Sequence, residues 1–307
     1  ISIGEDKILK KKKSITSIIR LLAANGLSEV VTYSFTKHDY AVEFKEDKNL
    51  IRLINPISAD LDVMRPSLIP NLLLTAKRSL NYGQSAVRIC ESGNVFYNTC
   101  QQDLHISGLR TGSVDERNWR SKSRIVDVFD AKSDIISLLE YFGIHEKDIT
   151  IESSIPSYYH QTRGGAILYG RKKLGFFGEL HPKIKKFFDI SENVVCFEIF
   201  ADVLLENRKK NQPYTLKVYP KISRDFSFVF SSKTAVGQVV NAIYKLDHRI
   251  SKVDIFDRFA INSLQNSIGI AVVLDAIDRT LTESEAQEVS EKIIQYVKSA
   301  GGELRGK

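Results

Sequence analysis

The feature that most constrains the fold is an alternation of phenylalanines in the last third of the chain. Phe226, Phe228 and Phe230 occupy every second position. Side chains of a strand point alternately to its two faces, so a period of two is typical of a strand with one buried face. Residues 223–231 are therefore predicted to form a strand whose three phenylalanines enter a core.

The segments after this strand predict a regular order of elements. They are a helix over 236–246 capped by Thr234, strand-like runs at 253–259 and 267–275 around a polar turn, a second helix that ends at Gly301, and a short strand at 302–305. Thr282 and Glu285 form the capping box that opens the second helix. This β-α-β-β-α-β order predicts a four-stranded antiparallel sheet with both helices on one face, which leaves the other face free for a ligand.

The first 206 residues mix helices and strands without a comparable period. Expected helices cover 14–25, capped by Ser14, 64–82 after an initial turn, and 135–142; expected strands cover Val30 to Phe35, 87–96, 105–109 and 194–200, with a hairpin over 166–180. Strands grouped in hairpins, with helices outside the groups, predict an α+β domain built around an antiparallel sheet.

Composition marks the domain boundaries. The polar, basic run at 207–213 ends in a proline and cannot bury a core, so it is predicted to be a linker. It separates a domain over 14–206 from one over 214–307. The chain begins with Ile1 rather than methionine, and we expect a piece of a longer protein in which residues 1–13 are the tail of a preceding module.

Composition also limits the class of protein. With 43% hydrophobic and 26% charged residues, the chain of 307 residues has ordinary globular composition. No apolar stretch approaches the roughly 18 residues of a membrane-spanning helix. Cys90, Cys100 and Cys196 show no CxxC spacing, which argues against a disulfide scaffold or a zinc site and favours a reducing cytoplasm. The formal net charge of +7 permits a polyanionic partner without requiring one.

Familiar catalytic motifs are missing from the sequence. There is no GxxxxGKS/T loop, no GxGxxG after a strand, no HExxH and no GxSxG elbow. The sequence therefore does not favour a phosphate-binding loop or a nucleophilic serine, and no metal ligands are predicted.

Two charged clusters leave alternatives open. Glu179 and His181, at the end of a predicted strand, have the residue types of an acid–base pair and would make the chain an autonomous enzyme. Alternatively, Glu179 is a buried carboxylate that tethers Arg163 and holds the hairpin against the sheet. We favour the structural alternative because no second carboxylate or nucleophile lies at a fixed spacing nearby. Arg88 and Glu91 are ambiguous in the same way.

The strand ends of the last domain carry another candidate set. Phe259 has the chemistry of a shelf for an unpaired base, and Asp257 that of an acceptor for a base edge. Arg258 or Arg305 would hold a phosphate or a base, and Ser267 begins the next strand. The alternative is a core phenylalanine beside solvated charges, and the pattern gives the two hypotheses equal weight.

Several motifs together resemble the C-terminal half of the bacterial phenylalanyl-tRNA synthetase beta subunit. They are GLSEVVTYSF at 26–35, NP at 55–56, MRPSLIPNLL at 64–73, ESGNVF at 91–96, GELHP at 178–182, YP at 219–220, SRDF at 223–226 and DRTLT at 278–282. The motifs follow the family's order through nearly the whole chain.

The resemblance implies a division of labour. The first domain would be similar to a class II synthetase catalytic fold that no longer catalyses and instead binds the alpha subunit. The last would be the ferredoxin-like anticodon-binding domain. In this family an α2β2 heterotetramer uses ATP and Mg²⁺, at a site in alpha, to join phenylalanine to tRNA(Phe). The resemblance implies that this chain would be a non-catalytic ligase subunit of the cytoplasm that needs no cofactor of its own.

A class II site also needs two arginines, one on a strand for the ATP phosphates and one after a late glycine-rich segment. Arg88 resembles the first, and nothing in the sequence resembles the second. The isolated chain is therefore predicted to be inactive. The remaining alternative is a stand-alone RNA-binding scaffold, which would bind tRNA without regard to its anticodon.

The family's anticodon contacts fall on positions that match Asp257, Phe259, Ser267 and Arg305 here. Phe259 stands where tyrosine is common in the family, which keeps stacking but removes a hydroxyl hydrogen bond. The segment 160–163 departs from the family's usual proline and glycine. The family's editing module and its beta-subunit Mg²⁺ ligands lie upstream of this sequence, so the resemblance transfers neither.

Overall fold

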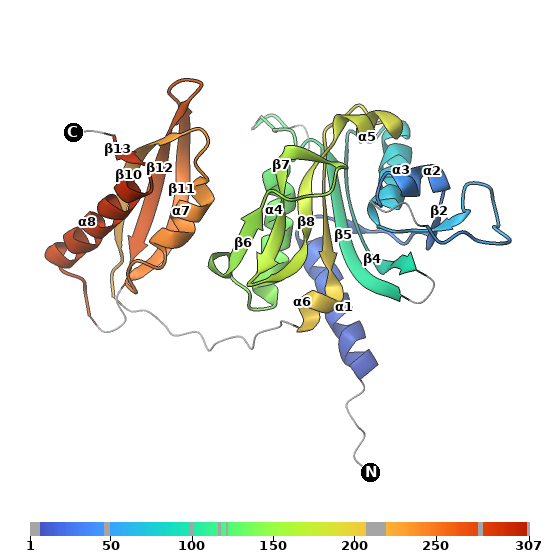
Figure 1. The fold of residues 1–307 in the computed structure, drawn as a ribbon, viewed down its shortest axis with the longest axis horizontal. Helices are drawn as coiled ribbons and strands as arrows, with labels where there is room; N and C mark the ends of the chain where they lie inside the picture. The colour runs from blue at the N-terminus through green and yellow to red at the C-terminus, as the bar shows by residue number, and fades with distance from the viewer. Residues whose placement is uncertain are drawn as a thin grey trace, which may run out of the picture. The chain divides into compact units, whose positions relative to one another are not determined.

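The chain folds into two compact units, Ile1–Asn211 and Gln212–Lys307 (Figure 1). The computed structural model describes residues 7–45, 50–98, 101–115, 118–120, 122–206, 219–275 and 279–305, with side chains from Lys11 onward. The predicted linker at 207–213 and Cys100 lie outside the described residues. Within the described ranges, no helix combines the length and the apolar character that a bilayer crossing requires.

The smaller unit is an antiparallel sheet with two helices. Its strand order is β11-β12-β10-β13, and all neighbouring strands are antiparallel. The elements are β10 (Ile222–Ser231), α7 (Val236–Ile243), β11 (Ile250–Ala260), β12 (Gln265–Leu274), α8 (Glu283–Ser299) and β13 (Glu303–Leu304). The predicted β-α-β-β-α-β order and the ferredoxin-like fold class are confirmed.

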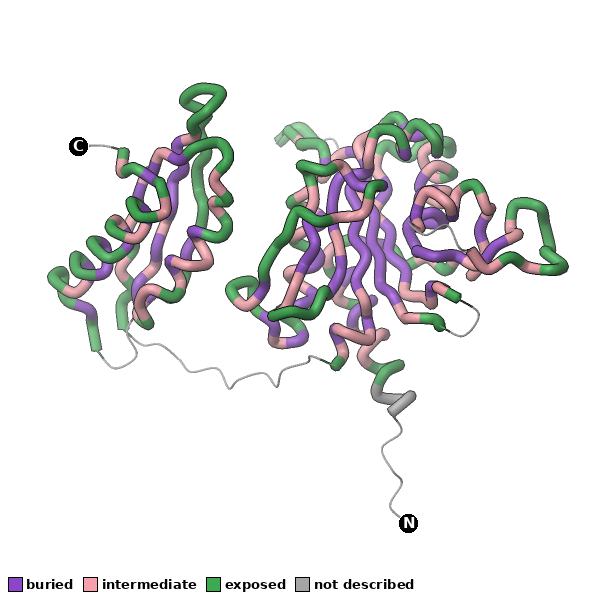
Figure 2. Tube along the Cα trace, viewed as in Figure 1, coloured by how far each residue is buried: buried purple, intermediate pink, exposed green. Residues whose placement is uncertain are grey.

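Both helices cover the same face of this sheet. Phe226, Phe228 and Phe230 are buried against Ile243 of α7 and Val289 of α8, as their alternation predicts. Figure 2 shows the contrast with β11, which is exposed over most of its length. The face of the sheet opposite the helices is therefore available to a partner.

The starts of the two helices differ from each other. At α8 the predicted capping box is present: the Thr282 hydroxyl accepts from the Glu285 amide, and the Glu285 carboxylate accepts from the Thr282 amide at 2.9 Å. At α7 the prediction is wrong, because the N-cap is Ala235, which has no side-chain cap. The Thr234 amide instead donates to the Ser231 carbonyl at 2.9 Å, so Thr234 belongs to the turn before the helix.

The larger unit is built on a seven-stranded sheet with the order β1-β4-β5-β9-β8-β7-β6. Every neighbouring pair is antiparallel except β1 and β4, which are parallel. Its helices and strands are α1 (Lys7–Ala24), β1 (Ser28–Glu29), β2 (Phe35–Thr36), α2 (His38–Val42), β3 (Val63–Met64), α3 (Ile69–Asn81), β4 (Ala86–Asn98), β5 (Gln101–Gly112), α4 (Val128–Tyr141), β6 (Ile149–Glu152), β7 (Tyr159–Tyr169), β8 (Lys172–Leu180), α5 (Pro182–Phe187), β9 (Val194–Phe200) and α6 (Ala201–Glu206). The predicted α+β class with an antiparallel sheet is confirmed.

This sheet has a hydrophobic core on each face. One core joins the strands to α1, α4 and α6 through residues such as Leu22, Leu138 and Leu204. The other joins them to α3 and α5 through residues such as Leu72 and Ile184. Helices on both faces leave the central strands almost wholly buried, which suits a structural platform (Figure 2).

Two helices of the larger unit begin earlier than predicted. Helix α1 starts at Lys7 rather than at Ser14, because lysine is a good helix former and no glycine or proline lies between Lys7 and the apolar stripe. Helix α4 starts at Val128 rather than at residue 135. Asp127 is its N-cap, and the Asp130 carboxylate accepts from the Asp127 amide at 2.8 Å, which completes a capping box.

The strand predicted over Val30 to Phe35 is largely wrong, because only Phe35 lies in a strand, β2. The Val30 amide donates to the Cys90 carbonyl of β4 at 2.8 Å, but Thr32 and Tyr33 are held by side chains. Glu91 accepts from the Thr32 amide at 3.2 Å and from the Thr32 hydroxyl at 2.8 Å, and the Asn71 amide group donates to the Tyr33 carbonyl at 2.8 Å. After Val30 these side-chain bonds take the place of a strand ladder, so the chain between β1 and β2 is irregular.

Candidate nucleic-acid interface

Four of the five residues predicted to bind the anticodon lie on the face of the small sheet that carries no helix, the open face. Phe259 pairs with Ser267, and Asp257 pairs with Gly269 on β12. The neighbouring residues of β12, Ile268 and Ile270, point into the core, so Ser267 and Gly269 point away from it.

Arg305 reaches the same face from the far edge of the sheet. Its amide donates to the Ser227 carbonyl at 2.7 Å, and its guanidinium carbon lies 5.9 Å from the centroid of the Phe259 ring. Phe259 is 55% exposed, so it is not a core residue. An exposed ring with a guanidinium beside it is a surface on which a nucleobase can stack.

Ser267 and Arg258 are placed differently. Ser267 is only 3% exposed, and its hydroxyl lies 3.1 Å from the Ser227 hydroxyl, so the two serines satisfy each other below the surface. Arg258 is in register with Ile268, and through it with Phe228, which puts it on the helix-covered face. The structure therefore brings together Asp257, Phe259 and Arg305, with Ser267 beneath them, and separates Arg258 from them.

A second aromatic ring on the open face escaped the sequence prediction. The pairing of β11 with β12 shifts by one residue between Ile255 and Asp257, so Phe256 is the extra residue of a β-bulge. A Cβ atom built on Gly269 would lie 2.8 Å from Cζ of Phe256, which shows that this ring occupies the space over the glycine. The one signal in the sequence is a glycine inside a strand, which often marks a bulge or a close approach.

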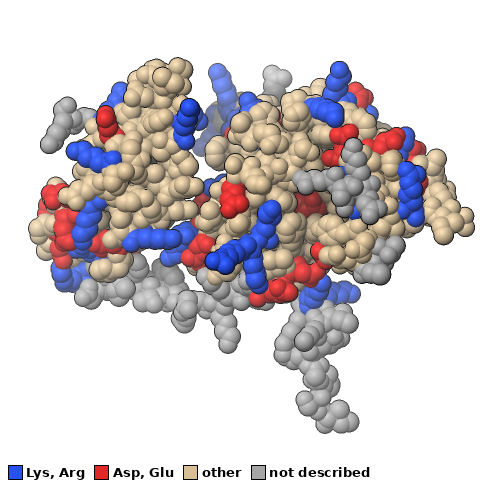
Figure 3. All heavy atoms as spheres, viewed as in Figure 1, with Lys and Arg blue, Asp and Glu red and all other residues tan. Residues whose placement is uncertain are grey.

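Arg305 differs from two other basic residues of the small unit in its ion pairing. Arg249 and Lys292 pair with Asp247 at 2.7 and 3.2 Å. In contrast, Arg305 forms no ion pair with any residue that the structure describes. On the side of the molecule that Figure 3 displays, basic and acidic side chains are interspersed. A guanidinium without a carboxylate partner is free to bind an anionic or polar ligand.

The charged clusters of the larger unit are engaged in structural contacts. Arg163 on β7 donates to Glu179 on β8 at 3.0 Å, which links the two strands of the hairpin. His181 is the N-cap of α5, and its Nδ1 accepts from the Lys183 amide at 3.1 Å. These contacts match the structural alternative for Glu179 and give His181 a role in starting a helix.

Arg88 and Glu91 point to opposite sides of β4. Arg88 donates through one nitrogen to the main-chain carbonyls of Ser113 and Val114. Glu91 is buried and accepts from Arg65 at 2.7 Å. Since Arg88 is bound to two carbonyls, this side chain does not fit a site for ATP phosphates.

The family of the chain is decided by two sequence matches. Residues 1–201 match the family described as phenylalanyl tRNA synthetase beta chain CLM domain, and residues 217–305 match the ferredoxin-fold anticodon binding domain. The chain belongs to the phenylalanyl-tRNA synthetase beta chain family. The second match covers the sheet whose open face is described above.

Curated relatives support this family along most of the chain. Proteins named phenylalanine–tRNA ligase beta subunit are 34% identical over 289 residues in Wolbachia sp. subsp. Brugia malayi, 35% over 318 residues in Bartonella henselae and 36% over 298 residues in Paramagnetospirillum magneticum. The matches cover 93%, 98% and 94% of this chain, but only 36%, 40% and 37% of those proteins. The chain therefore spans well under half the length of its relatives.

A solved structure is similar at a lower level. The pyrrolysyl tRNA synthetase of Desulfitobacterium hafniense superposes with a TM-score of 0.49 at 16% identity, over 67% of this chain and 71% of that one. A likeness at this level carries no argument about activity.

Proposed function

We propose that this chain is the C-terminal part of a phenylalanine–tRNA ligase beta subunit and that its open face binds the anticodon of tRNA(Phe). The observation that carries the proposal is the convergence of Asp257, Phe259 and Arg305 on one exposed face. Phe259 stacks on an unpaired base, Asp257 accepts a hydrogen bond from a base edge, and Arg305 binds a base or a phosphate. Ser267 acts indirectly, because the contact of its hydroxyl with the Ser227 hydroxyl links β12 to β10 beneath these side chains.

The larger unit has the complementary role of bracing the catalytic alpha subunit in an α2β2 assembly. Exposed apolar side chains support this role, because such groups mark protein interfaces when they gather. They flank the β2–β3 pair and comprise Val31, Tyr33, Ile54 and Ile57.

Alpha holds the ATP and Mg²⁺ of the ligase reaction, and the beta chain is non-catalytic; the binding of Arg88 to main-chain carbonyls supports that division. The free, buried thiols of Cys90 and Cys196 support a cytoplasmic location.

The test is the affinity of the intact chain for an anticodon stem-loop of tRNA(Phe), measured by fluorescence anisotropy. Stem-loops with one anticodon base replaced are expected to bind more weakly. Asp257→Ala should lose about 1–3 kcal/mol, roughly 5- to 150-fold in Kd, and with it the discrimination at one base. Glu291→Ala, which removes an exposed carboxylate of α8, is the matched control and should change neither. Equal affinity for every stem-loop would favour a sequence-blind scaffold instead.

A second experiment tests the bracing role by co-purification with the alpha subunit. Ile54→Asp is expected to abolish the association, because it places a charge in the proposed interface, while Tyr82→Asp at another exposed position leaves it intact. The alpha–beta complex should form phenylalanyl-tRNA when ATP and Mg²⁺ are present. Turnover by this chain alone, lost in Glu179→Ala, would support an autonomous acid–base enzyme.

A further inference from the structure

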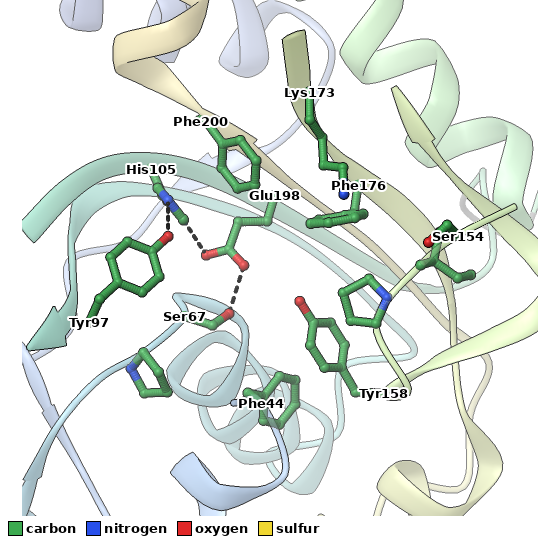
Figure 4. A pocket seen from close by; sticks show the side chains of 13 residues that line it. Phe44, Ser67, Tyr97, His105, Ser154, Tyr158, Lys173, Phe176, Glu198 and Phe200 are labelled. Carbon is green, nitrogen blue, oxygen red and sulfur yellow. Dashed lines mark hydrogen bonds and ion pairs between the residues drawn. The ribbon is translucent and has the colours of Figure 1, made fainter. Parts of the chain in front are cut away.

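The larger unit contains a pocket that includes none of the candidate residues discussed above. Its volume is about 380 Å³, which lies within the range of small-molecule sites. It is lined by strands β4, β5, β8 and β9, the segments before α3 and β7, and the loop after α2 (Figure 4). The pocket lies wholly within this unit, and the inference drawn from it does not depend on RNA binding.

Two pairs of aromatic rings form walls of the pocket. Phe176 and Phe200 lie with their centroids 5.8 Å apart, and Phe44 and Tyr158 lie 4.7 Å apart. Figure 4 shows the two pairs on opposite sides of the Glu198 carboxylate. A hollow between two aromatic walls is suited to a flat ring, because rings pack against one another face to edge or offset.

The floor of the pocket is a chain of hydrogen bonds. Glu198 accepts from Ser67 at 2.8 Å and from the Leu68 amide at 2.9 Å, and its other contact is His105 Nδ1 at 3.0 Å. Nε2 of His105 then faces the Tyr97 hydroxyl at 3.1 Å (Figure 4). The Ser67 hydroxyl and the Leu68 amide both donate to Glu198, as they would to an ionised carboxylate.

The titration of these groups fits that assignment. Burial alone would raise the pKa of Glu198, but the bonds from His105, Leu68 and Ser67 outweigh it and hold the pKa below its ordinary value. Burial and the nearby Glu198 charge raise the pKa of Tyr97. Tyr97 therefore keeps its proton, and its phenol oxygen can accept a hydrogen bond. Burying an ionised carboxylate costs more free energy than apolar packing, so a buried ionised carboxylate beside a pocket suggests a role in binding.

A cationic side chain lies over the wall that Phe176 and Phe200 form. The ammonium of Lys173, on β8, lies 5.0 Å from the centroid of the Phe176 ring. Lys173 is exposed, and among the residues that the structure describes it has no carboxylate partner. Its neighbour Lys172 points toward Glu206 at 3.8 Å. The pocket thus combines a hollow between aromatic walls, a floor that accepts hydrogen bonds and the ammonium of Lys173 at one wall.

We propose that this pocket binds a small aromatic carboxylate. The aromatic ring lies between the two pairs of phenyl and phenol rings, and the carboxylate pairs with Lys173. The ring presents its positively polarised edge to the floor, where Glu198 and Tyr97 offer oxygen atoms. A carboxylate deep in the pocket would face Glu198 and be repelled, which fixes the direction of the ligand with its anionic end at Lys173.

The experiment uses the intact chain and 3-phenylpropanoate as the probe, with binding followed by ligand-observed NMR. Saturable binding is expected. Replacing the carboxylate (3-phenylpropanamide) or the aromatic ring (3-cyclohexylpropanoate) should weaken it about tenfold each. Lys173→Gln should weaken the probe about tenfold but leave the amide unchanged, and Lys172→Gln is the matched control that leaves both unchanged. Lys173 and Lys172 are exposed, so both variants should fold.

Three outcomes would overturn the proposal. They are the absence of saturable binding, a Kd for the probe that Lys173→Gln does not change, and pocket-dependent binding of adenosine monophosphate with none of the carboxylate. A second variant, Phe176→Ala, tests the wall. It should weaken the probe and the amide alike, whereas Phe187→Ala, on α5, should weaken neither.

Discussion

A buried ion pair of the larger unit and the open face of the smaller unit use charge in opposite ways. In the larger unit the charges of Arg65 and Glu91 are paired out of solvent, with side chains 3% and 2% exposed. On the open face of the smaller unit, Arg305 stands in solvent over the Phe259 ring. The difference teaches that charge in the first case fixes the fold, because a buried ion must be paired, while charge in the second remains available to a ligand.

The contrast concerns surfaces rather than whole units. The smaller unit also buries a carboxylate, Asp247, and pairs it with Arg249 and Lys292. The larger unit also leaves charges in solvent, such as Arg163, whose side chain is 58% exposed. What separates the open face is that its aromatic rings and its guanidinium are exposed together.

The largest effect is expected from breaking the buried pair. Glu91→Gln leaves the Arg65 guanidinium charged and uncompensated, which should cost about 3–5 kcal/mol in the free energy of unfolding of the larger unit. Urea denaturation followed by circular dichroism measures it. Glu179→Gln is the control, because its partner Arg163 is mostly exposed and the pair should be worth about 1 kcal/mol or less. Equal costs for the two variants would remove the basis of the comparison.

The next effect is expected on the open face. Phe259→Ala removes a stacking surface and should weaken binding of the tRNA(Phe) anticodon stem-loop by about 1–3 kcal/mol. Its stability should change by no more than about 0.5 kcal/mol, because the ring is exposed. Phe259→Tyr should retain the affinity. Anisotropy and thermal melting give the two readouts, and a large loss of stability with unchanged binding would assign Phe259 to the core.

A smaller effect tests the buried carboxylate of the small unit. The hydrogen bonds from Arg249 hold the pKa of Asp247 below its ordinary value of 3.8. A lowered folded pKa stabilises the protein above the unfolded pKa, and this contribution is lost as the pH falls toward the folded pKa. Asp247→Asn should therefore cost about 1–2 kcal/mol at pH 7, and the cost should shrink below pH 4. A pH-independent cost would refute the electrostatic explanation.

The smallest effect probes the second ring of the open face. Gly269→Ala places a methyl group where the Phe256 ring lies and should displace that ring without unfolding the sheet. The expected loss of anticodon affinity is about 1 kcal/mol, similar to that of Phe256→Ala. The double variant should be no weaker than either single one, because both remove the same contact. Unchanged affinity in Phe256→Ala would show that the ring does not bind the RNA, and additive losses would show that Gly269→Ala does not act through the ring.

The small unit was predictable because its phenylalanines and capping box encode local geometry. The alternation at 226–230 indicated which face of β10 is buried. It left the placement of Phe259 open, because that depends on how β11 pairs with β12. The bulge at Phe256 was not predictable, since an insertion of one residue depends on the neighbouring strand. The irregular edge from Val30 to Phe35 escaped for a similar reason: the side chains that hold it, Glu91 and Asn71, are far away in the sequence.

The pocket of the larger unit was invisible for the same physical reason. Its carboxylate, Glu198, and its imidazole, His105, stand on adjacent strands but lie in distant parts of the sequence. No spacing rule connects them, and neither residue type is unusual in a strand. A site built across a sheet by antiparallel pairing becomes apparent only once the register is known.

The measurement that tests the central claim most directly is photo-crosslinking of tRNA(Phe) that carries 5-iodouridine or 5-iodocytidine in the anticodon loop, with the adduct located by mass spectrometry. We expect crosslinks in the peptides that contain Phe256 and Phe259, and their loss in Phe259→Ala. Crosslinks confined to the larger unit, with none on β11, would contradict the assignment of RNA binding to the open face.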